Sequence, residues 1–449
     1  MKKDKSYLLL KEPNLYKAFL TLAWPVMLAN LLKTLHDLVD TFFIGQMENS
    51  VPSQAAIAIT WPLLNIFLSL SIGLSVAGVA LISQYLGASQ PQKARQYSGI
   101  LLSLSLGVAV LFNILLFFLA SPVMRLMGAS GETLQASEIY LQTRAFELVF
   151  VFLFGAFQAT RQARGDTGTP VILSTISILL NIVLTGLFIQ LGHMGIFGAA
   201  LGTVIAQAAI APACLYLLFR RKDPMRLQLR DLKLSRQDTL HLIRVAVPSA
   251  ASSAFSSFGF LILQSMILSF GDIVAAAFSI GNKISNLLLT PVIALGSVLA
   301  AFVGQNVGAQ NPDRARAAYR TSRNTAVLLT VAGSILIYPF RIAFLSMLSN
   351  SPETIAIAEE YLFWVLLTQP LLAFFQNYLG VFNGSGNTGY SFRIESVRLW
   401  IIRIPLILFF KFCTPLGHSG VWYAMVISNF VILFYGAHLF RKVDFRSKI

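Results

Sequence analysis

The sequence contains two copies of one long segment. Residues 84–95, QYLGASQPQKAR, return as residues 305–316, QNVGAQNPDRAR, with six of twelve positions identical and an offset of 221 residues. The same offset relates the loop Gly165-Asp-Thr-Gly168 to Gly386-Asn-Thr-Gly389. An offset kept over this distance indicates that an ancestral half was duplicated, so the two halves are expected to share one fold.

The composition places both halves in a membrane. Apolar residues make up 56% of the chain, charged residues make up 12%, and the mean hydropathy is +0.70. This leaves too little polar surface to cover a soluble globule of this length. About twelve runs between residues 15 and 440 reach the roughly 20 apolar residues that a membrane span requires, and six of them fall in each half.

The spans are predicted to be helices arranged in two lobes. Alternation with a period of two is absent, and the apolar runs are too long for the strands of a barrel. Because six spans return each half to the side where it began, the repeat is parallel, with its axis along the membrane normal, as in transporters whose lobes enclose a central path. We therefore predict an all-α polytopic membrane protein with lobes at 1–219 and 242–449, joined by a polar cytoplasmic linker at 220–241.

The net charge of +15 is explained by topology rather than by nucleic-acid binding. With the N-terminus inside, most of the 34 Lys and Arg residues fall in inward segments, such as Lys2, Lys3 and the run Arg220-Arg221-Lys222. Such an asymmetry predicts that both termini are cytoplasmic. The expected location is the inner (plasma) membrane of a prokaryote, where the chain contacts lipid and no nucleic acid.

The cysteines and glycines indicate neither an enzyme nor a cofactor. Cys214 and Cys413 fall in predicted spans without metal-ligand spacing, and no Gly-rich loop of Walker type occurs. One enzymatic alternative remains, because His36 and Asp40 are four residues apart and would place two metal ligands on one helix face. No third ligand lies at a suitable spacing nearby, so we predict no metal, no cofactor and no enzymatic activity.

The first span holds four ionisable residues within eight positions: Lys33, His36, Asp37 and Asp40. Ionisable groups inside a membrane are costly and suggest a function by default. Lys33 and Asp37 share a helix face and are expected to neutralise each other. Asp40 has only His36 on its own face, and desolvation would bring its protonation into the physiological pH range. We predict that Asp40 carries a coupling proton; the alternative is a structural hydrogen-bond acceptor.

Four further polar residues are candidates to line the same cavity. Asn181 lies in the fifth span and Thr203 in the sixth, while Gln158 and Gln162 lie near the end of the fourth. Each is also compatible with a hydrogen bond between packed helices. Pro25 and Pro248 occupy matching places in the first helix of each half, where a proline permits either a hinge or a static kink.

Four segments carry a family resemblance. Asp40-Thr-Phe-Phe-Ile-Gly45 closes the first span, Gln84-x-x-Gly87-Ala88 and its copy Gln305-x-x-Gly308-Ala309 close the second and the eighth, and Gly165-Asp-Thr-Gly168 forms a loop. Together they resemble the multidrug and toxic compound extrusion (MATE) family, and within it the bacterial DinF-like branch. The resemblance covers essentially the whole chain. It implies a twelve-helix antiporter, expected to be a monomer, that expels small amphipathic, often cationic compounds in exchange for H+ or Na+.

The resemblance also implies roles for individual residues. The first-helix carboxylate of the family corresponds to Asp40, its fifth-helix asparagine to Asn181 and its sixth-helix threonine to Thr203. The substrate is then expected in the cavity of the first lobe, near Asp40. The aromatic side chains that could line it are Phe150, Phe154 and Phe157, for which simple packing is the favoured interpretation, and His36, Asp37 and Gln158 complete the predicted lining.

The sequence departs from the family's sodium sites. Thr185 stands one turn after Asn181, where members with a fuller cation site carry a second carboxylate. Residues 245–270 and 361–382 contain no Asp or Glu, whereas sodium-coupled NorM-like members carry acids there. H+ is therefore predicted as the coupling ion in preference to Na+.

Two alternatives within this fold remain. One is a Na+-coupled drug exporter. The other is a flippase for a lipid-linked saccharide, from the same wider superfamily, which would need a strongly basic cavity. Its candidate basic residues are Lys33, Lys283, Arg398 and Arg403.

Overall fold

The chain folds into two bundles of long helices. The computed structural model describes residues 6–45, 50–221, 223–349 and 351–447, with the side chains of residues 6, 35–42, 44–45 and 50–51 outside the description. Within these ranges every regular element is a helix and none is a strand. The all-α prediction is confirmed.

The first half contains seven α-helices. They are α1 (Ser6–Leu10), α2 (Leu15–Gly45), α3 (Ser50–Gly87), α4 (Pro91–Leu126), α5 (Gly131–Ala163), α6 (Gly168–Gly186), which continues as a π-helical turn η1 (Leu187–Leu191), and α7 (Gly195–Phe219). The connection to the second half carries one 3-10 turn, η2 (Leu229–Leu232). Because α7 ends at Phe219 and the next helix begins at Arg236, this linker spans residues 220–235, which is shorter than the predicted 220–241.

The second half repeats this order. Its helices are α8 (Arg236–Leu268), α9 (Asp272–Gly308), α10 (Pro312–Ser346), α11 (Pro352–Gly384), α12 (Thr388–Ser396), the π-helical segment η3 (Val397–Arg403), α13 (Ile404–Cys413) and α14 (Ser419–Arg441). Eleven helices in the described part of the chain are long and apolar enough to cross a membrane. The remaining predicted span, the fifth of the second half, falls on the interrupted helix α12–η3–α13.

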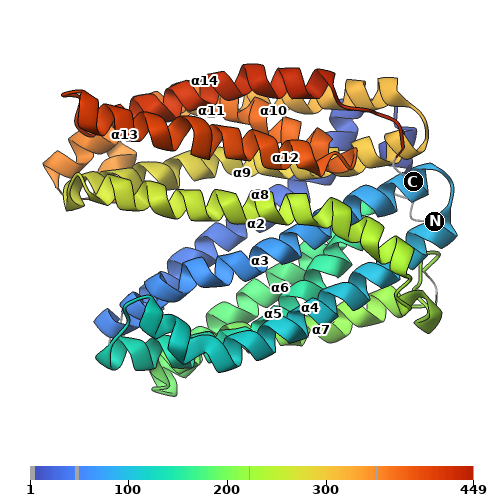
Figure 1. Ribbon diagram of the computed structural model, residues 1–449, viewed down its shortest axis with the longest axis horizontal. Coiled ribbons are helices and arrows are strands. Elements are labelled where there is room, and N and C mark those ends of the chain that lie inside the picture. The colour runs from blue at the N-terminus through green and yellow to red at the C-terminus, as the bar shows by residue number, and fades with distance from the viewer. Residues whose placement is uncertain (1–5, 46–49, 222, 350, 448–449) are drawn as a thin grey trace.

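The two bundles approach each other at one end. In Figure 1 the helices α3–α7 form the lower bundle and α8–α14 the upper one, and they converge toward the side that holds both chain termini. The linker 220–235 lies on that side too, so we call it the linker end and the opposite side the distal end. The helices α3 and α9 both finish at the linker end, where they pack against each other.

The first helix of each half packs against both lobes. Near the linker end, Phe19 of α2 belongs to the core of the second lobe and stacks on Phe302 of α9, with ring centroids 4.4 Å apart. Reciprocally, Leu242 and Val245 of α8 belong to the core of the first lobe. Farther along, α2 packs on α6 and α8 packs on α12, each within its own half. Each first helix therefore bridges the two lobes.

The sequence repeat is reproduced in backbone conformation and in hydrogen bonds. Gly165 and Gly386 have φ angles of 76° and 75°, a left-handed conformation that glycine adopts without strain. The hydroxyl of Thr167 donates to the carbonyl of Leu22 (2.8 Å), and that of Thr388 donates to the carbonyl of Val245 (2.7 Å). Both carbonyls lie just before the helix-interior prolines Pro25 and Pro248, where a proline disturbs the helix's own hydrogen bonds.

Reciprocal contacts between the repeated glutamines and glycines close the linker end. The side-chain amide of Gln84 donates to the carbonyl of Gly384 (3.3 Å), and that of Gln305 donates to the carbonyl of Ala163 (2.6 Å). A Cβ atom at Gly87 would overlap the carbonyl of Gln305, and one at Gly308 would overlap that of Gln84. Only glycine permits α3 and α9 to approach this closely.

Candidate functional site

Helices α6 and α7 hold a buried polar pair in the first lobe. The side-chain amide of Asn181 donates to the hydroxyl of Thr203 (3.1 Å), which in turn donates to the carbonyl of Ala199 (3.1 Å). Both side chains are at least nine-tenths buried. Thr185 is buried one turn after Asn181, and its hydroxyl oxygen has no hydrogen-bond partner among the described residues. The structure therefore brings together the two polar residues that the sequence placed in the fifth and sixth spans.

Helix α2 lies beside this pair. Phe43 packs against Gly186 of α6, where an added Cβ atom would lie 3.1 Å from the phenylalanine ring. Both helices run from the linker end to the distal end. The turns that carry Asp40 and Asn181 therefore lie one helical turn closer to the linker end than Phe43 and Gly186. The side chains of His36, Asp37 and Asp40, which the sequence singled out, lie outside the described residues.

The predicted glutamines and phenylalanines of α5 have other surroundings. Gln158 is exposed, and Gln162 reaches the other lobe, where its amide donates to the carbonyl of Ser297 (2.7 Å). Phe157 is fully buried in the first-lobe core, which makes it a packing residue, and Phe154 contacts it. Gln162 therefore belongs to the closure of the linker end.

Two further acids inside or beside spans are ion-paired. Glu147 lies 2.8 Å from Arg144, and Glu395 lies 2.9 Å from Arg398, each pair three residues apart on one helix. In the described part of the chain no group of three or more His, Cys, Asp or Glu side chains is arranged to hold a metal ion.

A large pocket lies between the lobes in their distal halves. Its volume is about 820 Å³, and it is lined by α3, α8 and α9. The polar lining consists of neutral side chains, among them Asn65, Gln264, Asn282 and Asn286, and the apolar lining includes Trp61, Phe258 and Phe260. A pocket of this size with an apolar wall and a few polar groups suits a drug-sized amphipathic molecule. We call it the interlobe pocket.

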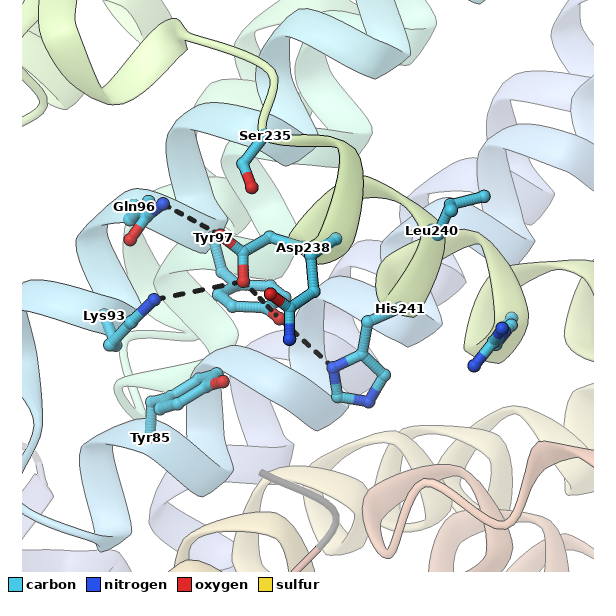
Figure 2. Close-up of a pocket in the computed structure, with 10 residues that line it drawn as sticks. Tyr85, Lys93, Gln96, Tyr97, Ser235, Asp238, Leu240 and His241 are labelled. Carbon is cyan, nitrogen blue, oxygen red and sulfur yellow. Dashed lines mark hydrogen bonds and ion pairs between the residues drawn. The ribbon is translucent and has the colours of Figure 1, made fainter.

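A second pocket, of about 700 Å³, lies at the linker end (Figure 2). There Asp238 of α8 accepts hydrogen bonds from Gln96 (2.9 Å) and Tyr97 (3.1 Å) of α4, and the Tyr97 hydroxyl lies 3.1 Å from Nδ1 of His241. Lys93 approaches the same carboxylate at 3.9 Å. This network joins the two halves of the chain, and no motif or repeat in the sequence predicted it.

One aspartate of the linker pairs with two arginines of the first lobe. Asp223 forms ion pairs with Arg161 (3.0 Å) and Arg164 (2.9 Å) and accepts a hydrogen bond from the amide of Met225 (2.8 Å). Burial alone would raise the pKa of this carboxyl. The hydrogen bonds from Arg164 and Met225, with the charges of Arg164 and Arg161, outweigh burial and lower the pKa below its ordinary value.

We expect Asp223→Asn to lower the unfolding free energy by about 2 kcal/mol at pH 7, because it leaves buried Arg161 without its closest counter-charge. A group whose pKa is lowered on folding stabilises the protein above its unfolded pKa of about 4, and the stabilisation is lost as the pH falls through the folded pKa. The difference in thermal stability between wild type and variant, measured in detergent by intrinsic fluorescence, should therefore shrink below about pH 4.

Asp313→Asn, at an exposed ion pair, is the control and should change the melting temperature little. Equal melting temperatures at pH 7 would contradict this assignment.

Comparison with known proteins gives one consistent result. The sequence model of the MatE family matches residues 25–187 and again residues 248–409, once in each half. The probable multidrug resistance protein YoeA of Bacillus subtilis is 25% identical over 439 residues, covering 96% of this chain and 94% of YoeA. The probable multidrug resistance protein NorM of Thermotoga maritima is 25% identical over 430 residues, covering 94% of this chain and 91% of NorM.

Solved structures show the same fold. An outward-facing multidrug resistance MATE family transporter of the MOP superfamily superposes with a TM-score of 0.91 over 98% of each chain, at 23% identity. The helix order and the two-lobed arrangement described above are therefore shared over 98% of each chain.

Proposed function

Since this chain belongs to the MatE family of multidrug and toxic compound extrusion transporters, we propose that it is a multidrug efflux antiporter that exports amphipathic, often cationic compounds in exchange for H+. Members of this family are transporters and not enzymes, which is the class that the sequence predicted. The observation that carries the proposal is the interlobe pocket of about 820 Å³, which lies in the distal halves of helices whose linker ends are sealed together.

This arrangement corresponds to one end state of alternating access. The contacts of Gln84 and Gln305 seal the linker end, while the pocket lies toward the distal end. The excess of basic residues at the linker end supports a cytoplasmic position for that end, and we assign the conformation as outward-facing on that basis. In the inward-facing state the reciprocal contacts must separate.

Proton coupling is supported by the side chains available for ion binding. Na+ binding requires several oxygen ligands, commonly with a carboxylate, and Thr185 stands where a second carboxylate would complete the first-lobe site. In the second lobe, the cavity between α9, α11 and α14 is lined by Arg398 and Arg403, whose charges disfavour a cation. Asp40 is the residue to which we assign the coupling proton.

Sodium is expected to be dispensable for transport. Efflux of a fluorescent cation from proteoliposomes should follow an imposed pH gradient, and a Na+ gradient at clamped pH should leave the rate at the level of protein-free liposomes. Na+-driven efflux comparable to H+-driven efflux would overturn the ion assignment while leaving the exporter function in place.

Substrate and proton are expected to compete for the ionised carboxylate of Asp40. Coulomb attraction to a cation is strong at low local dielectric, and protonation removes it, so affinity for a permanently cationic dye should fall as the pH drops from about 8 to 5. By linkage, dye binding must release a proton. Equilibrium binding measured by fluorescence anisotropy, with a neutral analogue of the dye as control, tests this. A pH-independent affinity would rule out direct competition.

The flippase alternative is less well supported by the positions of the basic residues. Lys33 and Lys283 are exposed, and Arg398 is paired with Glu395. Arg403 is then the one basic side chain of the four that is buried without an ion pair in the described part of the chain. A pyrophosphate carries more charge than this single side chain neutralises.

A further inference from the structure

A small cavity lies inside the second lobe and adjoins the interlobe pocket. Its volume is about 180 Å³, and it is enclosed by α8, α9, α11, η3 and α14. Phe260, Asn282 and Asn286 line both spaces, so the interlobe pocket and this second-lobe cavity adjoin along these three side chains.

The cavity contains a positive charge that forms no ion pair with any described carboxylate. Arg403 is only 8% exposed, and its guanidinium donates to the hydroxyl of Ser428 (2.9 Å) and to the amide oxygen of Asn429 (2.9 Å), both of which are neutral. No carboxylate in the described part of the chain forms an ion pair with it. An unpaired charge buried in a membrane protein is costly, and such a residue points to a functional partner.

Other donors in the same cavity also lack acceptors within the described part of the chain. The indole Nε1 of Trp422 is buried without a hydrogen-bond partner, and Trp422 is 1% exposed. The Nε of Arg398 is likewise without an acceptor, although its Nη2 binds Glu395. A cavity that combines two arginines and unused N–H groups with no carboxylate among its described lining residues suits an anionic oxygen ligand.

The walls of the cavity are aromatic. Trp422 stacks on Phe278 with ring centroids 6.1 Å apart and contacts Tyr361 at 4.7 Å. Flat apolar walls around a charged donor favour an aromatic ring that carries one anionic group. A carboxylate matches the planar fork of an arginine, and its single charge matches the one unpaired guanidinium.

The repeat makes this cavity the counterpart of the first-lobe site. Asn181 of α6 binds Thr203 of α7 in the first lobe, and in the second lobe the corresponding fifth and sixth spans supply Arg403 of η3 and Ser428 and Asn429 of α14. The second lobe thus has a buried cation between its fifth and sixth spans, whereas the first lobe has a neutral amide between the corresponding pair of spans. The π-helical segment η3 ends at Arg403, and such segments are frequent at functional sites.

We propose that the second-lobe cavity binds the carboxylate of an amphipathic aromatic molecule, with Arg403 as its charge partner and Trp422 as a further hydrogen-bond donor. The proposal rests on the proposed export function only in treating this molecule as a transported substrate. It extends the substrate class from cations to aromatic acids, and to zwitterions whose cationic group would face the first lobe.

Calorimetric titration of the full chain with 2-naphthoate tests the proposal, with the neutral 2-naphthamide as the matched ligand. In nanodiscs of phosphatidylcholine at pH 7, we expect the acid to bind at least about tenfold more tightly than the amide, because charge-assisted hydrogen bonds are roughly twice as strong as neutral ones. Arg403→Gln should remove this preference, and Trp422→Phe should weaken acid binding a few-fold. Arg393→Gln, at an exposed arginine on α12 outside the cavity, is the charge-matched control and should behave as wild type.

Equal affinity for acid and amide, or a preference that survives Arg403→Gln, would overturn the proposal. A loss of naphthoate binding in nanodiscs that contain phosphatidylglycerol would identify lipid phosphate as the occupant and would equally overturn it. Binding of the cationic dye, retained in Arg403→Gln, shows that this variant is folded. If the wild type itself does not bind the dye, that result counts against the proposed first-lobe site and does not affect the proposed carboxylate site in the second lobe.

Discussion

Replacement of Asp40 by asparagine is expected to abolish efflux driven by a pH gradient. Asparagine has nearly the same shape as aspartate but cannot exchange a proton, so the coupling step is lost while the packing of α2 is kept. The turn of α2 that carries Asp40 lies beside the turn of α6 that carries Asn181, as the contact between Phe43 and Gly186 requires. We expect the efflux rate of a cationic dye from proteoliposomes to fall to that of protein-free liposomes.

Asp37→Asn provides the matched control, since it makes the same chemical change one turn away on the same helix. It is expected to keep the pH dependence of efflux, because Lys33 stands on its face of the helix as a counter-charge, and to lower only the affinity for the dye, because Asp37 is a predicted lining residue. The yield and melting temperature of both variants should match those of the wild type. Full pH-dependent transport by Asp40→Asn would remove Asp40 from the mechanism and direct attention to other titratable groups.

The repeat in the sequence predicted more of the fold than the hydropathy did. The equivalence of Gln84 with Gln305 became a pair of equivalent hydrogen bonds, to Gly384 and to Ala163, which are themselves 221 residues apart. Hydropathy located the spans, but it could not show that α2 and α8 each bridge both lobes. A repeat identifies equivalent segments, yet it does not say which copy a segment packs against, because that depends on close approaches such as Gly73 of α3 to Ala250 of α8.

The candidate site was predictable only where a polar residue interrupted an apolar span. Asn181 and Thr203 stood out for that reason, and they are hydrogen-bonded to each other. Gln162 is also a polar residue in an apolar span, but it contacts Ser297 of the other lobe. The partner of its side chain depends on how the two bundles pack together, which the sequence does not show. Arg403 was visible as a basic residue in a span, but its unpaired state follows from the π-helical turn and from α14, which the sequence does not reveal.

The second large effect is expected from adding side chains where α3 meets α9. A Cβ at Gly308 would overlap the carbonyl of Gln84, and the opposing atoms are backbone that cannot rotate aside. Overpacking of this kind costs about 1–3 kcal/mol or more, and each 1.4 kcal/mol changes an equilibrium tenfold. Gly308→Val should therefore shift the population about tenfold or more toward a conformation with an open linker end.

Transport should then fail for a reason unrelated to binding. An antiporter must pass through both end states in every cycle, so a carrier that cannot close at the linker end releases no substrate at the distal side.

Spin labels attached through Gln92→Cys and Asp313→Cys report on the closure, because these repeat-related positions are exposed at the starts of α4 and α10, at the linker end of each lobe. In Gly308→Val, electron–electron resonance should show a longer distance between the labels than in the parent, with dye efflux lowered at least about tenfold. Gly107→Val makes the same change in α4, where a Cβ meets no atom within 4 Å, and should leave both readouts unchanged. An unchanged distance together with normal efflux in Gly308→Val would show that the glycine contact is not required for closure, and the hydrogen bonds of Gln84 and Gln305 would then have to hold the linker end shut by themselves.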